Sequence, residues 1–365
     1  MKQARLLRLL GRSLGTTASS ARAWSLLAKA GEIPWEEVVY HASRLAITPS
    51  LAVVWRRNGL WSVTPEALRE YLDATIELNR ERNHWILRHL ETVGSALNRV
   101  GLEPLLMKGL SHLVDGLFVD RGMRLMTDLD LLIPPTRLLD AVQALKASGF
   151  SERHQETIPP GHHHYPMLAR DGDLAGVELH FALLPELRGN PRLVEAILAD
   201  ARPVTIGTAT VLQPAPWDRI VITLLHAHCR SNALLFRPHL DLLALWNRHD
   251  TPVTHQRVSQ RFQTMGCPSD LWRGLIMTEQ LLKVRLPFPE PRPLAHRLIV
   301  ALELAWPDLW YAFLYVQAGL KPHLATPASR VRLLRLLIKP GWYRHNFSVL
   351  STLLRDASIK TDHHA

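Results

Sequence analysis

Two aspartates separated by one residue are the first candidates for chemistry in this sequence. Asp128 and Asp130 flank Leu129, and the apolar residues 131–133 and Pro134 follow them. A short apolar run that ends at a turn signal predicts a buried strand, in which alternate side chains share a face. Because neighbouring carboxylates repel each other and lose hydration when buried, the pair predicts a bound divalent cation. The alternative is a solvated strand end whose acids serve only solubility or capping.

A turn upstream of this strand is suited to phosphate. Residues 105–107 predict another strand, after which Lys108, Gly109 and Ser111 lead the chain into a helix. A glycine turn at a helix N-terminus, with a lysine and a hydroxyl beside it, suits polyphosphate oxygens. Acids for a metal ion and a turn for phosphate together predict phosphoryl or nucleotidyl transfer.

A third acid lies on another short alternating segment, residues 177–181. Glu178 and His180 would share one face of that strand, with apolar residues on the other face. If this strand pairs beside the Asp128 strand, Glu178 joins the metal site. Otherwise Glu178 forms a salt bridge with one of the many arginines, and His180 serves as a structural histidine.

The order of these motifs resembles that of a known family, the uncharacterised bacterial nucleotidyltransferase family of the DNA polymerase β superfamily. The matching residues are a lysine-glycine pair, an arginine four residues before the acidic pair, and the glutamate-histidine strand: Lys108, Gly109, Arg124, Asp128, Asp130, Glu178 and His180. The resemblance implies the minimal nucleotidyltransferase fold, a mixed sheet flanked by helices that binds a nucleoside triphosphate and two Mg²⁺ ions, or Mn²⁺ in their place.

The resemblance also implies roles for individual residues. The catalytic and metal-binding residues would be Asp128, Asp130 and Glu178. The nucleotide-binding residues would be Lys108, Gly109, Ser111, Arg124 and His180. One departure concerns Ser111, because the broader superfamily usually carries Gly-Ser directly at the turn and Leu110 intervenes here. Arg124 has an alternative role as a brace for the carboxylate strand.

Further histidines invite other interpretations. The run 162–164 reads His-His-His, but consecutive residues of an extended loop point in different directions, and no cysteine or acid follows at tetrahedral-site spacing. Zinc binding is therefore disfavoured, and contact with substrate or nucleotide stays open. Farther on, His226 and Arg230 lie one helical turn apart and, with Asp241, resemble the matching region of the family. They would close over phosphates or pack structurally.

Composition limits the class of protein and its partners. The 365-residue chain carries a net charge of +10, a pI near 10.0, 21% charged and 47% hydrophobic residues. This balance indicates a globular protein with an anionic partner: a nucleotide, a nucleic acid or an anionic membrane surface. Two cysteines imply no disulfide framework. No apolar run approaches the length of a transmembrane helix. The first 31 residues are basic and contain no acid, which favours a basic helix over a transit peptide. We therefore expect a cytoplasmic protein.

The patterning predicts an α+β fold in three regions. Residues 1–100 are mostly helical, although Arg82 and Asn83 interrupt an apolar stripe there. Residues 101–215 form the α/β core, with a small hairpin near its end. Residues 216–365 return to helices, one of them predicted at 331–338.

These patterns predict a metal-dependent nucleotidyltransferase that moves a nucleoside monophosphate from a nucleoside triphosphate to an acceptor hydroxyl or phosphate. Natural-product or peptide tailoring is one context for such an enzyme. A toxin-like enzyme acting on tRNA or protein is the nearest enzymatic alternative. A non-catalytic nucleotide or nucleic-acid binding protein on the same fold is the alternative from another class. The acceptor, the base preference and the oligomeric state are not encoded in any motif that the chain displays.

Overall fold

The structure is a computed structural model that describes residues 3–15, 18–153, 162–184, 191–228 and 236–305. Residues 1–301 form one compact unit, which holds the whole described sheet, and residues 302–365 form a second. The predicted helix at 331–338 lies outside the described residues.

Helices dominate the first hundred residues, as the sequence predicts. Four precede a short 3₁₀ turn at Trp61–Val63: α1 (Gln3–Leu14), α2 (Ala18–Lys29), α3 (Trp35–Arg44) and α4 (Thr48–Arg57). The long helix α5 (Glu66–Asn98) follows, with its buried residues at helical spacing. The polar interruption at Asn83 does not break α5. Asn83 is buried and donates through Nδ2 to the backbone oxygen of Arg124 at 2.9 Å, so α5 holds the loop that leads to the acidic strand.

One mixed sheet of seven strands forms the centre of the described unit. In chain order the strands are β1 (Leu105–Leu106), β2 (Asp128–Leu132), β3 (Ser151–Glu152), β4 (Leu168–Ala169), β5 (Gly176–His180), β6 (Arg202–Ile206) and β7 (Ala209–Gln213). Their order across the sheet is β3-β4-β5-β2-β1-β7-β6. The predicted hairpin is β6 and β7, and β6 lies at the sheet edge. The α+β class, with a mixed sheet and flanking helices, is confirmed.

The neighbouring positions of β2 and β5 confirm the pairing on which the metal-site hypothesis depends. The two strands run parallel, with Asp130 opposite Glu178 and Leu132 opposite His180. Leu129 and Val177, on the other face, belong to the main hydrophobic cluster, to which α5 also contributes. Burial of this apolar face fixes the register, because a one-residue slip would turn the acids into the core.

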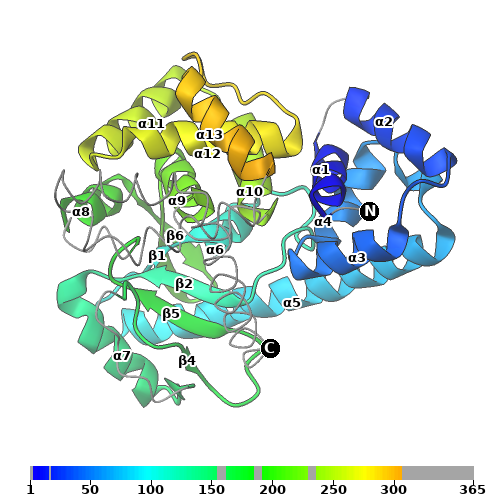
Figure 1. The fold of residues 1–365 in the computed structure, drawn as a ribbon. Coiled ribbons are helices and arrows are strands. Elements are labelled where there is room, and N and C mark those ends of the chain that lie inside the picture. The colour runs from blue at the N-terminus through cyan, green and yellow to red at the C-terminus, as the bar shows by residue number, and fades with distance from the viewer. Residues whose placement is uncertain (1–2, 16–17, 154–161, 185–190, 229–235, 306–365) are drawn as a thin grey trace, which may run out of the picture. The chain divides into compact units, whose positions relative to one another are not determined.

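Helices cover both faces of the sheet (Figure 1). On one side lie α5 and α7 (Leu138–Ala147), which follows a 3₁₀ turn at Pro135–Arg137. On the other side lie α6 (Lys108–Val114) and the helices after the hairpin. The remaining helices are α8 (Pro191–Asp200), α9 (Pro216–His228), α10 (Phe236–His249), α11 (Pro252–Thr264), α12 (Pro268–Leu282) and α13 (Leu294–Ala305). The sequence interpretation missed α8 and α11.

Candidate metal and phosphate site

The acidic site is built on the polar face of the β2–β5 pair. Asp128 and Asp130 come from β2, and Glu178 and His180 come from β5. Asp130 is 4% exposed and His180 is fully buried, whereas Asp128 and Glu178 are partly exposed. The site therefore opens at the Asp128 end and is closed beneath His180. Strand alternation explains this arrangement, because residues two apart on paired parallel strands project from the same face.

Asp130 is the centre of the polar contacts. Its Oδ1 accepts a hydrogen bond from His180 Nε2 at 2.8 Å and pairs with the Lys108 ammonium. The same imidazole nitrogen lies 3.4 Å from Glu178 Oε2. One histidine nitrogen therefore faces carboxylates of both strands, and one lysine supplies the nearest full positive charge.

The acids of this site differ in acidity. Burial, together with the charges of Asp130 and Glu178, raises the pKa of Asp128 to about 6. Burial alone would also raise the pKa of Asp130, but the Lys108 ammonium and the His180 hydrogen bond outweigh it and hold that pKa well below its usual range. Burial is likewise outweighed at Glu178, where the hydrogen bond with His180 lowers the pKa. At Asp128 the charges of Lys108 and Arg237 lower the pKa by too little to offset burial and the neighbouring acids.

The turn before α6 brings Lys108 to the acids. Met107 N donates to Asp130 O at 3.1 Å, which ties the turn to β2. Lys108 adopts a left-handed backbone with φ of 47°, a conformation that disfavours most side chains. Ser111 is buried, and its hydroxyl donates to Lys108 O at 2.8 Å. The Ser111 hydroxyl therefore braces the turn, and the proposal of a direct phosphate contact rests on Lys108 and Gly109.

A close approach of the Arg124 side chain leaves no room for a Cβ at Gly109 unless the guanidinium shifts. A Cβ added at Gly109 would lie 2.1 Å from Arg124 Nη1 and 2.2 Å from its Cζ. The guanidinium is held from the other side by Asp241 of α10, to which Nε donates at 3.0 and 2.9 Å. Burial raises the pKa of Asp241, against the opposing charge of Arg124. The lysine-glycine pair and the arginine, 15 residues apart in the sequence, thus form one packed unit.

A second arginine at this position was not singled out from the sequence. Arg237 of α10 donates through Nη1 to Leu125 O at 3.1 Å, and Arg124 Nη1 donates to the same oxygen at 3.2 Å. Two guanidinium groups therefore meet at one carbonyl, three residues before Asp128. Burial lowers the pKa of Arg237. The available signal was helical spacing, because Arg237 lies one turn before Asp241.

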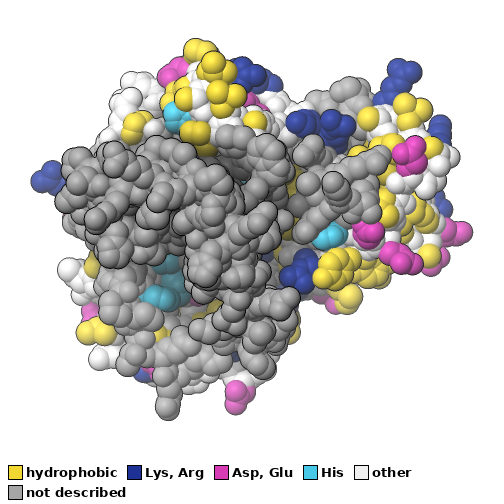
Figure 2. Space-filling view, viewed as in Figure 1, with side chains coloured by type: hydrophobic (Ala, Val, Ile, Leu, Met, Phe, Trp, Pro, Cys, Tyr) yellow, Lys and Arg dark blue, Asp and Glu magenta, His cyan; other side chains and the backbone are white. Residues whose placement is uncertain are grey.

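The histidine run lies beside the acids. His163 and His164 have ring centroids 5.3 and 5.2 Å from that of His180, and His162 lies 5.0 Å from His164. Backbone bonds hold the segment against the end of β5, where Phe181 N donates to His163 O at 3.0 Å. Histidine side chains gather over the β2–β5 pair on the surface seen in Figure 2.

The distal histidine hypothesis is only partly covered by the structure. His226 lies on α9, and the predicted partner Arg230 lies outside the described residues. Asp241 does reach the site, through Arg124.

The donor atoms present suit a divalent cation. One donor atom each from Asp130, Glu178 and His180 lies within 4.8 Å of the other two, and these are the only three such side chains so grouped in the part of the chain that the structure describes. Two carboxylate oxygens and an imidazole nitrogen are ordinary ligands of divalent metals. The group shares Asp130 and Glu178 with the predicted metal set, but it contains His180 in place of Asp128.

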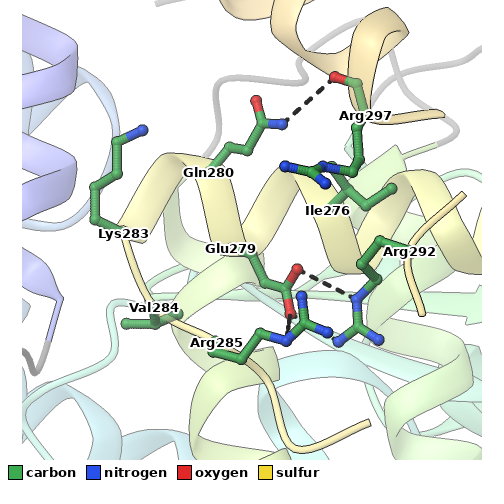
Figure 3. Close-up of a pocket in the computed structure, with 8 residues that line it drawn as sticks. All are labelled: Ile276, Glu279, Gln280, Lys283, Val284, Arg285, Arg292 and Arg297. Carbon is green, nitrogen blue, oxygen red and sulfur yellow. Dashed lines mark hydrogen bonds and ion pairs between the residues drawn. The ribbon is translucent and has the colours of Figure 1, made fainter. Parts of the chain in front are cut away.

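A basic pocket also occurs far from these acids in the fold, between α12 and α13 (Figure 3). Its volume is about 370 Å³, and its walls are Ile276, Glu279, Gln280, Lys283, Val284, Arg285, Arg292 and Arg297. The buried Arg292 donates to Glu279 and to the backbone oxygens of Phe288, Glu290 and Leu286. All five of its donors are used, so Arg292 stabilises the proline-rich loop before α13.

Comparison with known proteins adds a family to this geometry. The family model described as "Uncharacterised nucleotidyltransferase" matches residues 31–283, which include the acids, the histidines and the phosphate turn of the candidate site but not all of the basic pocket. None of the curated proteins compared with the chain matches it. Among the described helices, none has the length and apolar character needed to cross a membrane.

Proposed function

The chain belongs to this nucleotidyltransferase family, and from that premise we propose that it transfers a nucleoside monophosphate from a nucleoside triphosphate to an acceptor hydroxyl or phosphate. The observation that carries the proposal is the parallel pairing of β2 and β5. It sets Asp130 beside Glu178 and leaves both within reach of His180 Nε2, while the Lys108 ammonium contacts Asp130.

Each part of the site has a role in this proposal. Asp128, Asp130 and Glu178 bind the divalent cations, which are Mg²⁺ or Mn²⁺. A bound cation would stabilise the charge that develops on the α-phosphate and would lower the pKa of the acceptor hydroxyl. Lys108 and the α6 turn at Gly109 contact the β- and γ-phosphates, with Arg124 beside them. Ser111 braces this turn, and His180 Nε2 lies against the carboxylates of Asp130 and Glu178.

In the proposed reaction the acceptor oxygen attacks the α-phosphorus. The bond from that phosphorus to the bridging oxygen breaks, and pyrophosphate leaves with the bonding electrons. The acceptor's proton passes to a carboxylate. We assign this step to Glu178, which lies opposite Asp130 on the neighbouring strand β5 and is partly exposed.

The proposal includes a cytoplasmic location, since a chain with two cysteines is suited to a reducing compartment. The acceptor class decides between a tailoring enzyme and one that modifies tRNA or protein. Binding to RNA should weaken steeply as salt rises, because many phosphates are neutralised at once. Binding to a small acceptor should not.

The test is transfer of label from each of the four α-labelled nucleoside triphosphates, in Mg²⁺ or Mn²⁺, to protein, RNA or small molecules of a cell extract. We expect transfer by the wild type and by Asp140→Ala, an exposed acid on α7. We expect none by Asp128→Ala with Asp130→Ala. Binding of nucleotide without transfer by the folded wild type, with any nucleotide or acceptor pool, would instead favour a non-catalytic nucleotide-binding protein.

A further inference from the structure

The arrangement of His180 bears on which metal ion the site selects. Its Nε2 lies 2.8 Å from Asp130 Oδ1 and 3.4 Å from Glu178 Oε2. Neighbouring ligand atoms of an octahedral ion lie about 3 Å apart, because each bond is about 2.1 Å long and the bonds meet near 90°. The two distances at Nε2 bracket that spacing. The nitrogen therefore occupies the position of a third ligand, next to the two carboxylate oxygens.

Packing holds His180 close to the two carboxylates. It is fully buried and at the end of β5, and the rings of His163 and His164 lie about 5 Å from its own. An ion that binds Asp130 Oδ1 and Glu178 Oε2 on the side of His180 would contact Nε2, which lies within 3.4 Å of both oxygens. An ion that tolerates only oxygen would have to displace a packed side chain.

We propose, on the basis of the proposed function, that His180 Nε2 is a direct metal ligand and that the site selects a first-row transition-metal dication such as Mn²⁺ over Mg²⁺. Mg²⁺ prefers an all-oxygen shell and keeps much of its water, whereas imidazole nitrogen binds transition-metal ions well. Mn²⁺ and Mg²⁺ are close in size and coordination geometry. A set of two carboxylates and one imidazole therefore distinguishes them by the type of ligand atom and not by the space available.

The affinity should be moderate. Histidine ligands usually donate their second ring N–H to a carboxylate or carbonyl, and such partners change metal affinity by about 10–100-fold. His180 Nδ1 is buried and has no hydrogen-bond partner among the described residues. When Nε2 coordinates an ion, the proton must reside on this unpartnered Nδ1. The Lys108 ammonium, which contacts the same oxygen of Asp130, must also move away.

The test uses Mn²⁺ alone, without nucleotide, on the full-length chain. Pulsed electron paramagnetic resonance of bound Mn²⁺ should show coupling to an imidazole nitrogen in the wild type and in His164→Gln, whose histidine is adjacent but outside the ligand group. The coupling should vanish in His180→Gln. Mg²⁺ should displace Mn²⁺ from the wild type only at about 100-fold excess or more. From His180→Asp, Mg²⁺ should displace Mn²⁺ at near-equal concentration.

Protein labelled with ¹⁵N-histidine provides a measurement that does not depend on a variant. The nitrogen coupling should change to that of ¹⁵N. The inference would be overturned if bound Mn²⁺ showed no nitrogen coupling, or if the coupling survived in His180→Gln. It would also be overturned if equimolar Mg²⁺ displaced Mn²⁺, or if Mn²⁺ did not bind at millimolar concentration. If the inference fails in this way but Mg²⁺ supports label transfer, the proposed function stands without the inferred histidine ligand. Nitrogen coupling in a protein that transfers no label would leave the metal site standing and overturn the proposed function.

Discussion

Replacing Lys108 with methionine should tighten metal binding and weaken nucleotide binding in the same protein. The Lys108 ammonium pairs with Asp130 Oδ1, the oxygen that also faces His180 Nε2. A metal ion must therefore compete with the ammonium for that oxygen. Methionine has a similar length and no charge, so Lys108→Met removes the competitor while filling most of its volume.

The magnitude follows from the exposure of the ion pair. A hydrogen bond to a charged group contributes about 1.5–3 kcal/mol. Because the Lys108 side chain is 19% exposed, water screens part of the interaction, and we take the lower end of that range. A change of about 1.4 kcal/mol corresponds to a factor of ten, so the Mn²⁺ dissociation constant should fall about tenfold. The affinity for a nucleoside triphosphate with its metal should fall by a similar factor, because a phosphate contact is lost.

Titration of Mn²⁺ followed by its free-ion electron paramagnetic resonance signal measures the first effect, at pH 8, where the acids remain ionised. Binding of a fluorescent nucleoside triphosphate analogue measures the second. Lys146→Met is the matched control, because Lys146 pairs with Glu152 at 2.7 Å far from β2 in the sheet order. It should change neither constant. Unchanged or weaker Mn²⁺ binding by a folded Lys108→Met protein would refute the assignment of the ammonium as a competitor.

Three further variants test the surrounding structure. Gly109→Ala should displace the Arg124 guanidinium, since the new Cβ would lie 2.1 Å from Nη1. Nucleotide binding in the fluorescence assay should weaken at least tenfold, whereas the Mn²⁺ dissociation constant should stay near the wild-type value. Asp128→Asn should raise the melting temperature of the protein without added metal at pH 8 but not at pH 4. Burial raises the pKa of Asp128 in the folded protein to about 6, above the 3.8 of an unperturbed aspartate, so stability of up to about 3 kcal/mol is present below pH 4 and is lost as the pH rises through 6. Arg292→Ala should lower the free energy of unfolding, measured with denaturant, by about 3–5 kcal/mol, because it breaks a buried ion pair with Glu279. Arg285 is 65% exposed and lies 3.7 Å from the same glutamate, so Arg285→Ala should lower it by less than about 1 kcal/mol. Equal losses would contradict the structural role of Arg292.

The strands of the site could be predicted from the sequence because their patterns are local. Alternation between acids and apolar residues at 128–133 and 177–181 fixes which side chains share a face, and a buried apolar face leaves one register. The pairing of β2 with β5 is not local, since 43 residues lie between Leu132 and Gly176. The sequence left this pairing as a condition for the metal site, and the structure confirms it.

The features that the sequence did not reveal depend on contacts between distant side chains. Asn83 reads as a defect in an apolar stripe, yet its amide binds the backbone at Arg124. The histidines at 162–164 follow each other in an irregular segment, and backbone contacts with β5, including the bridge between His164 and His180, bring them to the acids. Arg237 lies one helical turn before Asp241, but its donation to Leu125 O joins residues that are far apart in the sequence. In each case a polar group contacts a residue that is distant in the sequence, so no short motif contains both partners.

The charges that meet at the site indicate how a bound metal ion would help it attract a triphosphate. The acids are Asp128, Asp130, Glu178 and Asp241. The cations are Lys108, Arg124 and Arg237. Three cations nearly balance four acids in the metal-free protein, which limits the cost of burying them together. A divalent cation changes a net charge of −1 to +1 and displaces Lys108 from Asp130, so the site becomes attractive to phosphate only once metal is bound. Metal should therefore bind before the nucleotide or with it, and nucleotide affinity should fall sharply when the metal is removed by a chelator.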